Sequence, residues 1–406
     1  MSDPLSWHRV IRRLITESHL VAGDGLSRML DDALRPVGIR AEVLLVDMGQ
    51  RTLTPIGREP SGSQSVQGSL AGRAFQHGEH VAGTGAEGAR VLWMPMLDGT
   101  ERAGVIRLEL GDDVVDDADL RRHCWTVSGL MGHVVMSKMV YSDHLRQLRA
   151  PQPLSVASEM LWQLVPPRTF ATDRVVVSAL LEPYDRVAGD AYDYAVDSGI
   201  VYLAVFDGVG HDLEAGFTTA LAVSVIRNAR RRGETDLSAL ADETDRHIAA
   251  RGGSRRFVTA VLARLDTATG VLDYLVAGHP APLLLRDGHM VRSLQAPPLL
   301  PLGVSTNPAR RRPAAREQLE PGDRLLFYSD GIVEARDAEG TYFGERRLVD
   351  LTERNEQSGL TAPETLRRLA AAVLDHQAGE LQDDATLLML DWSTEGHRTM
   401  FPDTLD

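Results

Sequence analysis

Apolar residues along the chain occur at helical spacing in some segments and in short extended runs in others. Between residues 8 and 35, Val10, Leu14 and Leu30 lie near helical spacing, and Pro36 follows them. An apolar residue every three or four positions gives a helix one buried face, and proline removes a backbone donor that a helix needs. The pattern therefore predicts one helix over 8–35.

Extended apolar runs follow this helix and indicate a small antiparallel sheet. The last two runs are separated by Asp98-Gly99, a pair typical of hairpin turns. A short helix is predicted over 71–76, and a longer one begins after the acidic cap Asp116-Asp117. Helices around an antiparallel sheet indicate an α+β, sensor-like domain over residues 1–140. The predicted strands are 40–48, 51–56, 90–97 and 102–110.

Residues 141–167 have the pattern of a helical linker. The preceding helix is expected to continue through 140–148, until Pro151 and Pro153 interrupt it. A second helix is predicted over 155–164. The two pieces could act as a lever between domains or as a passive spacer, and the sequence favours neither.

The region 168–395 alternates groups of apolar strands with pairs of helices. Strands are followed by two helices, more strands, two further helices and a last strand. The gap at Asp287-Gly288 is short enough for a hairpin, which favours antiparallel pairing over crossover connections. The expected architecture is a four-layer α/β/β/α sandwich of two antiparallel sheets, each covered by a helix pair. Residues 297–313 are predicted to form a surface loop, and 396–406 a C-terminal tail.

Composition narrows the class of protein. The 406 residues include 43 basic and 57 acidic ones, a balance of 43 − 57 = −14, which argues against a nucleic-acid partner. The sequence contains no run of 18 apolar residues, which a membrane-spanning helix would need. Its first residues lack a secretory pattern. A single cysteine, Cys124, excludes an internal disulfide and fits a reducing cytoplasm. We therefore expect a cytoplasmic α+β protein.

Four aspartates lie at the ends of predicted strands in the region 168–395. If neighbouring strands pair as antiparallel hairpins, both aspartates of a pair fall at the same edge of a sheet. Carboxylates at a buried edge are costly unless a positive charge neutralises them. The predicted pairs are Asp190 before strand 191–196 with Asp207 after 200–206, and Asp330 after 324–328 with Asp383 before 386–392.

Oxygen ligands in this number suit a hard divalent cation. Three or four carboxylates with a backbone carbonyl are typical of Mg²⁺ or Mn²⁺ sites. The sequence offers no cluster of cysteine and histidine for structural zinc. Gly189, Gly208 and Gly331 stand beside the aspartates, and without a Cβ they allow carbonyls and ions to approach closely. The alternative for any single Asp-Gly pair is an ordinary turn.

The four aspartates lie within four of five short motifs that follow one another along the chain. The motifs are Arg186-Val-Ala-Gly-Asp190, Phe206-Asp207-Gly208, Ala277-Gly278-His279-Pro280, Ser329-Asp330-Gly331 and Asp383-Asp384-Ala-Thr386. Together, over about 150–395, they resemble the metal-dependent protein phosphatase (PPM) family in its bacterial SpoIIE/RsbU-like branch. Residues 1–140 more weakly resemble a GAF sensor domain by their strand and helix order, with a PAS domain as the alternative.

The resemblance implies a phosphoserine/phosphothreonine protein phosphatase with two Mn²⁺ or Mg²⁺ ions. Asp207 would bridge both ions, and the carbonyl of Gly208 would bind one of them. Asp190 would serve one ion, whereas Asp330 and Asp383 would serve the other. The implied substrate is a phosphorylated STAS-domain antagonist of an anti-sigma factor. The resemblance further implies a homodimer joined through the linker, and control by an unknown ligand or protein at the GAF-like domain.

Other polar residues near these motifs are candidates for handling the phosphate. Arg186 could grip it bidentately and His211 could donate a proton; the simpler interpretations are a surface arginine and a loop histidine. His279, in a Gly-His-Pro turn, is expected to be structural. Asp193 could orient a water or make ordinary hydrogen bonds. Asp212 stands where the family usually has glycine, and could be an outer ligand or simply exposed.

Two other functions fit parts of this pattern. A catalytically weak signalling adaptor would bind a phosphoprotein without hydrolysing it, but the intact aspartate set argues against this. A phosphodiesterase or nuclease would also use cations, but the acidic balance and the lack of aromatic and basic stripes argue against nucleic acid. The phosphatase interpretation needs no side-chain nucleophile, since a water shared by two cations reacts near neutral pH.

Overall fold

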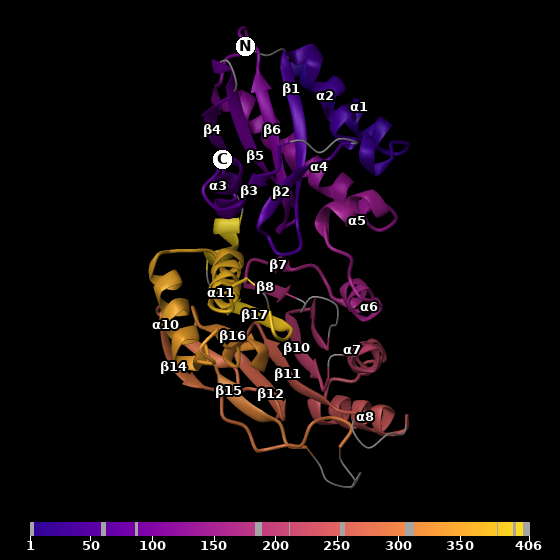
Figure 1. The fold of residues 1–406 in the computed structure, drawn as a ribbon, viewed down its shortest axis with the longest axis vertical. Helices are drawn as coiled ribbons and strands as arrows, with labels where there is room; N and C mark the ends of the chain where they lie inside the picture. Colours follow the sequence, from indigo (N-terminus) through magenta and orange to yellow (C-terminus); the bar gives the residue numbers. More distant parts are fainter. Residues whose placement is uncertain are drawn as a thin grey trace. The chain divides into compact units, whose positions relative to one another are not determined.

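A computed structural model shows two compact units in the chain (Figure 1). Unit 1 comprises Met1–Gln152 with Arg398–Asp406, and unit 2 comprises Pro153–His397. Each unit has its own cores and is described by itself below. The described residues are 4–57, 62–85, 88–182, 189–210, 212–251, 256–304, 312–379, 381–392 and 395–400.

Unit 1 is built on a six-stranded antiparallel sheet (Figure 1). Its strands are β1 (Ile39–Val46), β2 (Thr52–Pro55), β3 (Gln64–Ser65), β4 (Val81–Thr84), β5 (Arg90–Asp98) and β6 (Glu101–Leu110). Their order in the sheet is β3-β2-β1-β6-β5-β4. The predicted hairpin is confirmed, since β5 pairs with β6 and Gly99 at the turn has a φ of 59°. The edge strands β3, of two residues, and β4, of four residues, were not predicted.

Helices cover both faces of this sheet. Alternate residues of β1 point to opposite cores: Val43 packs with Trp7 and Met131, whereas Leu44 packs with Phe75. The first core lies under α1 (Pro4–Ser18), α2 (Leu26–Leu34), α4 (Ala118–Met139) and α5 (Asp143–Arg149), and the second under α3 (Leu70–His77).

The single helix predicted over 8–35 is wrong. The chain forms α1 and α2, separated by a 3₁₀ turn at Gly23–Gly25. Gly23 is buried, and a Cβ there would collide with the hydroxyl of Ser142 and with Leu145. Helical spacing alone did not reveal this break, although Gly23 and Gly25, which weaken a helix, stand at it.

The helix predicted to run through 140–148 is also interrupted. α4 begins at the expected cap, where the Asp117 carboxylate accepts from the backbone N–H of Leu120 at 2.8 Å. It ends at Met139, and α5 begins separately after Ser142. Because Leu145 is buried in the core of unit 1, α5 belongs to this unit.

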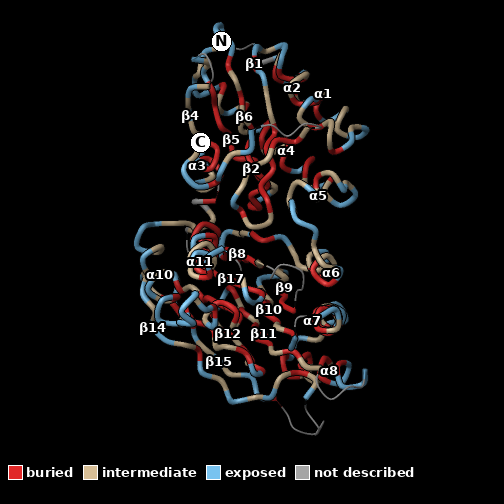
Figure 2. Tube along the Cα trace, viewed as in Figure 1, coloured by how far each residue is buried: buried red, intermediate tan, exposed pale blue. Residues whose placement is uncertain are grey.

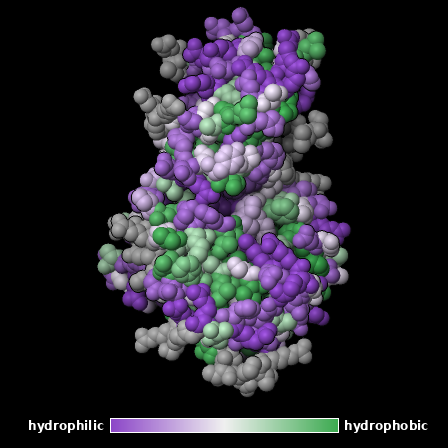
Figure 3. Space-filling view, turned by 90° about the vertical axis from the view of Figure 1, so that its right-hand side faces the viewer, coloured by the Kyte–Doolittle hydropathy of each residue, from purple (hydrophilic) through white to green (hydrophobic). Residues whose placement is uncertain are grey.

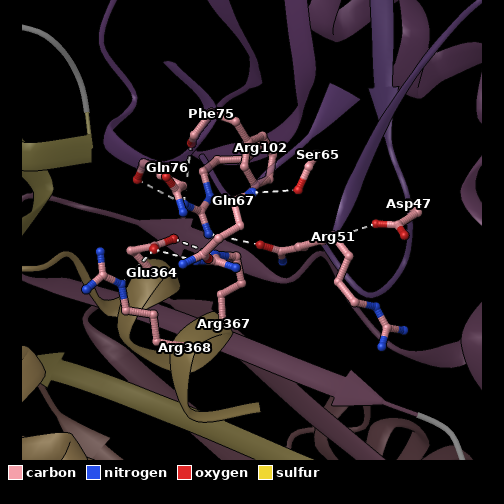
Figure 4. Close-up of polar contacts among 11 residues, drawn as sticks. Asp47, Arg51, Ser65, Gln67, Phe75, Gln76, Arg102, Glu364, Arg367 and Arg368 are labelled. Atoms are coloured by element: carbon pink, nitrogen blue, oxygen red, sulfur yellow. Dashed lines mark hydrogen bonds and ion pairs between the residues drawn. The ribbon is translucent and has the colours of Figure 1, made fainter. Parts of the chain in front are cut away.

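A buried arginine ties the sheet of unit 1 to the end of α3 (Figure 4). The guanidinium of Arg102, on β6, donates to the side-chain oxygen of Gln50 at 3.0 Å and to the carbonyl of Gln76 at 3.2 Å. It also lies 4.7 Å from the centre of the Phe75 ring. Carbonyl, amide and ring contacts together offset part of the cost of burying this charge.

Unit 2 contains two antiparallel sheets, as the sequence predicts (Figure 1). The five-stranded sheet has the order β15-β12-β11-β10-β9 and the six-stranded sheet the order β14-β13-β16-β17-β8-β7. The strands are β7 (Thr169–Ala171), β8 (Val175–Glu182), β9 (Asp190–Asp197), β10 (Ile200–Gly208), β11 (Val258–Asp266), β12 (Val271–Ala277), β13 (Leu283–Arg286), β14 (His289–Ser293), β15 (Ala315–Gln318), β16 (Arg324–Tyr328) and β17 (Ala385–Trp392).

The two sheets of unit 2 share one core, and helices cover their other faces. Val205 and Val261 of the first sheet are buried with Leu325 and Leu388 of the second. Buried residues are concentrated in these strands (Figure 2). The outer face of the first sheet packs on α6 (Val156–Leu164), α7 (Leu213–Arg231) and α8 (Leu237–Ala249), and that of the second on α9 (Asp330–Val333), α10 (Gly344–Gln357) and α11 (Ala362–His376).

A buried carboxylate at the start of α11 is held by neighbouring arginines. Glu364, in the first turn of α11, is 1% exposed and accepts from the guanidinium groups of Arg367 and Arg368 (Figure 4).

In the segment 297–313, expected to be a surface loop, Leu302 is buried and exchanges backbone hydrogen bonds with Val258. The described part of this segment is otherwise irregular and mostly exposed, as expected, and Leu302 attaches it to β11.

The surface is largely polar where it is described. On the face shown in Figure 3, hydrophilic residues cover much of the surface and hydrophobic ones occur in smaller groups. Within the described ranges, no helix combines the length and apolar character that crossing a lipid bilayer requires.

Candidate metal centre

The first pair of aspartates lies on neighbouring strands. β9 and β10 pair antiparallel, and their register places Asp190 directly opposite Asp207. This confirms the predicted hairpin. Asp190 begins β9, and Asp207 is the last residue but one of β10, so both lie at the same end of the five-stranded sheet.

The second pair lies at the end of another antiparallel ladder. β16 and β17 pair so that Tyr328 lies opposite Leu387, which confirms the second predicted pairing. Asp330 follows β16 as the first residue of α9, and Asp383 stands just before β17. Each sheet of unit 2 therefore contributes one aspartate pair from the ends of two adjacent strands.

Hydrogen bonds join the ends of the two sheets. The Thr386 hydroxyl, on β17, donates to Oδ2 of Asp190 at 2.7 Å, and the Ser329 side chain also bonds this carboxylate. Asp384 Oδ2 accepts from the backbone N–H groups of Gly189 and of Asp190, the latter at 3.3 Å. Asp190 is 3% exposed, so these contacts fix its carboxylate inside the protein.

The two aspartate pairs lie close enough for the charge of one pair to raise the pKa of a residue in the other. Burial first, and then neighbouring carboxylates led by Asp330 and Asp383, raise the pKa of Asp207 to about 7. Burial and then the charge of Asp207 raise the pKa of Asp190 well above its ordinary value. Burial and then Asp383 raise the pKa of Asp330. Acidic groups shift in this direction when they share a poorly solvated site without a neutralising charge.

A cluster of this composition fits hard divalent cations. Carboxylate oxygens are the ligands that Mg²⁺ and Mn²⁺ prefer, and a positive charge would reverse the upward pKa shifts. Among the described residues, no group of three His, Cys, Asp or Glu is arranged so that it could hold an ion as it stands. A cation bound between these carboxylates would neutralise their mutual repulsion.

The glycines beside the aspartates allow backbone carbonyl oxygens to approach closely, as expected. A Cβ on Gly331 would collide with the carbonyl oxygen of Asp384, and one on Gly208 would collide with the hydroxyl of Thr219. A Cβ on Gly189 would lie 2.7 Å from the carbonyl oxygen of Gly208. These glycines allow the strand ends to pack closely.

Two other aspartates are engaged elsewhere. Asp193 is 1% exposed and accepts from the guanidinium groups of Arg227, at 2.6 Å, and Arg230. Of its two predicted roles, hydrogen bonding is the one observed. Asp212 caps α7 by accepting from the backbone N–H of Ala215 at 2.9 Å.

The structure adds residues that the motifs did not single out. Thr259 of β11 places its hydroxyl 3.4 Å from Asp207 Oδ2 and 2.7 Å from Nδ1 of His279. The contacts of Thr386 and Asp384 were also missed, although both residues lie in a quoted motif. Their proximity to Asp383 in the sequence was the only available signal. Arg186 and His211, the candidates for phosphate binding and proton donation, lie outside the described residues.

Comparisons with known proteins agree with this geometry over the C-terminal half. Residues 197–393 match the family described as Stage II sporulation protein E (SpoIIE). Phosphoserine phosphatase RsbU of Bacillus subtilis is 26% identical over 261 residues, which cover 62% of this chain and 75% of RsbU. Phosphoserine phosphatase RsbP of the same organism is 25% identical over 167 residues, which cover 40% of each protein.

A solved structure is also similar. The RsbU and RsbW domains of Rv1364c from Mycobacterium tuberculosis align with a TM-score of 0.47 and 26% identity, covering 56% of this chain and 61% of that one.

The family match and the similarity to RsbU identify a phosphatase domain, in which carboxylates lie at the ends of two antiparallel sheets. The C-terminal half of this chain contains such a domain, of the SpoIIE type and similar to RsbU. The family match begins at Asp197, after Asp190, and does not extend into unit 1.

Proposed function

We propose that unit 2 is a metal-dependent phosphoserine/phosphothreonine protein phosphatase. The observation that carries the proposal is the meeting of two aspartate pairs from two sheets, in which neighbouring charges raise the pKa of Asp207 to about 7. Two bound Mn²⁺ or Mg²⁺ ions would supply an activated water and neutralise phosphate charge. The similarity to two phosphoserine phosphatases supports the same activity.

Different aspartates of the chain would bind the two ions. Asp207 lies opposite Asp190 and also interacts with the second pair, so it is the candidate to bridge both ions, assisted by the Gly208 carbonyl. Asp190 would serve one ion, with its carboxylate oriented by Thr386. Asp330 and Asp383 would serve the other ion. Arg186 and His211 remain proposals for gripping the phosphate and donating a proton.

We further propose the domain plan of a regulated phosphatase. A GAF-like sensor over 1–140 would bind an unidentified ligand or protein. The segment 141–167, whose α5 packs in unit 1 and whose α6 packs in unit 2, would join the sensor to the phosphatase domain over 168–395, and two chains could pair through it. The six-stranded sheet with helices on both faces supports the sensor assignment. By resemblance to the RsbU-like branch, the substrate would be a phosphorylated STAS-domain antagonist of an anti-sigma factor.

Hydrolysis of an aryl phosphate tests the activity. The parental protein should hydrolyse it only with Mn²⁺ or Mg²⁺, and Asp207→Asn and Asp330→Asn should abolish the reaction. Asp197→Asn is the matched control, because Asp197 is exposed at the opposite end of β9. Parental activity in both site variants would refute the ligand assignment. Timed dephosphorylation of phosphorylated STAS proteins from the source cell tests the substrate.

The adaptor remains the second candidate. The observation in its favour is that no described group of three acidic or histidine side chains is arranged to hold an ion as it stands. An adaptor would bind the phosphoprotein equally well with EDTA or Mn²⁺ and release no phosphate. Phosphate release that depends on Mn²⁺ and on Asp207 would exclude it.

A further inference from the structure

His279 connects the two sheets of unit 2 beside the aspartate cluster. It follows β12, is 7% exposed, and contacts a residue from each sheet. Its Nε2 lies 3.1 Å from the carbonyl oxygen of Tyr328, at the end of β16. Its Nδ1 lies 2.7 Å from the hydroxyl of Thr259, on β11. The ring therefore contacts β16, which leads to Asp330, and Thr259 on β11, which lies opposite Asp207 of β10.

The chemistry of these partners fixes where the protons lie. A carbonyl oxygen only accepts hydrogen bonds, so Nε2 must carry a proton and donate it to Tyr328. Burial lowers the pKa of His279 to about 4, so the ring is neutral at pH 7 and its Nδ1 has no proton. Thr259 must then donate its hydroxyl proton to Nδ1. The hydroxyl has only one proton, and its 2.7 Å contact with Nδ1 is much shorter than the 3.4 Å contact through which it could donate to Oδ2 of Asp207, so His279 is the favoured acceptor.

We propose that His279 is a positioning residue for the metal site: it holds the Thr259 hydroxyl proton away from Asp207, so that this carboxylate keeps its lone pairs for cations. The inference rests on the proposed function, because it assumes that Asp207 binds metal. Without an acceptor at Nδ1, the Thr259 hydroxyl would turn to the nearby carboxylate, which is the stronger acceptor. A cation would then have to compete with that hydrogen bond for the same oxygen.

Two substitutions separate the two contacts of the ring. In His279→Gln, the side-chain amide can still donate to the Tyr328 carbonyl, but the acceptor for Thr259 is lost. In His279→Asn, the shorter side chain places its oxygen near the former Nδ1, so the acceptor is kept. We expect Mn²⁺ to bind about tenfold more weakly to His279→Gln, the lower end of what such supporting contacts usually contribute, and with near-parental affinity to His279→Asn.

A second-site substitution distinguishes positioning from a merely structural role. Thr259→Val removes the hydroxyl that would turn to Asp207, so adding it to His279→Gln should return Mn²⁺ affinity toward the parental value. Loss of packing alone would instead leave the double variant as weak as the single one, or weaker. His289→Gln is the matched control, since that side chain is 65% exposed on β14 and away from the cluster.

The experiment is a calorimetric titration of each full-length variant with Mn²⁺, supported by the rise in melting temperature that Mn²⁺ produces. Tenfold weaker binding in His279→Gln, with recovery in His279→Asn and in the double variant, would support the inference. Parental affinity in His279→Gln, or no recovery in the double variant, would overturn it while leaving the phosphatase proposal intact. A parental protein that binds no Mn²⁺ would overturn both.

Discussion

Replacing Asp207 by asparagine should stabilise the metal-free protein while removing its response to metal. The substitution keeps the shape of the side chain and deletes one negative charge from a cluster that also holds Asp190, Asp330 and Asp383. Burial and these neighbours raise the pKa of Asp207 from 3.8 to about 7. Its ionised form is therefore unfavourable in the folded state when no cation is present.

The size and pH dependence of this effect follow from the two pKa values. The unfolded chain releases the Asp207 proton near pH 3.8, whereas the folded chain holds it up to about pH 7. Stability is therefore lost as the pH rises between these values, and the full cost, about 4 kcal/mol, is present at pH 8. An asparagine has no such cost, so the advantage of Asp207→Asn should grow from pH 5 to pH 8.

Thermal unfolding in EDTA and in Mn²⁺ measures both parts of the prediction. Since 1 kcal/mol moves the midpoint of a domain of this size by about 2–4 °C, we expect Asp207→Asn to melt about 8 °C or more above the parent in EDTA at pH 8. Mn²⁺ should raise the melting temperature of the parent and leave the variant unchanged. Asp197→Asn, on the same strand, should behave as the parent does.

Two results would refute this reasoning. If Asp207→Asn melted below the parent in EDTA at pH 8, ionised Asp207 would not destabilise the metal-free protein, contrary to its raised pKa. If Mn²⁺ raised the melting temperature of the variant as much as that of the parent, Asp207 would not be a metal ligand.

Three further predictions concern residues around the cluster. Thr386→Val removes the hydroxyl that donates to Asp190 and should weaken Mn²⁺ binding about tenfold in calorimetry, whereas Thr386→Ser should not; equal affinities would contradict the orienting role. Gly331→Ala would force a Cβ against the Asp384 carbonyl and should cost about 1–3 kcal/mol in urea unfolding. Because burial lowers the pKa of His279 to about 4, the protein should lose about 3 kcal/mol as the pH falls from 6.5 to 4, and His279→Gln should show a shallower loss.

The sequence alone was sufficient for the strand pairs and for the four aspartates. Alternating and continuous apolar runs predict where strands lie, and short gaps predict hairpins, because both depend on neighbouring residues. The pairing of β9 with β10 follows from such local pattern, whereas β16 and β17 are separated by three helices, so their pairing was inferred from the antiparallel architecture expected for the whole region. Once the strands pair antiparallel, Asp190 and Asp207 must share one edge, so half of the site needs no further information.

Only the tertiary structure decided how the two aspartate pairs are joined, and which polar residues face the cluster and which are held by other partners. Asp193 and Asp190 are three positions apart on one strand, yet Asp193 is held by two arginines of α7, whereas Asp190 faces the cluster and bonds Thr386. The roles of His279 and Thr386 depend on contacts between sheets. Such contacts are set by the packing of segments distant in sequence, which no local spacing of residues encodes.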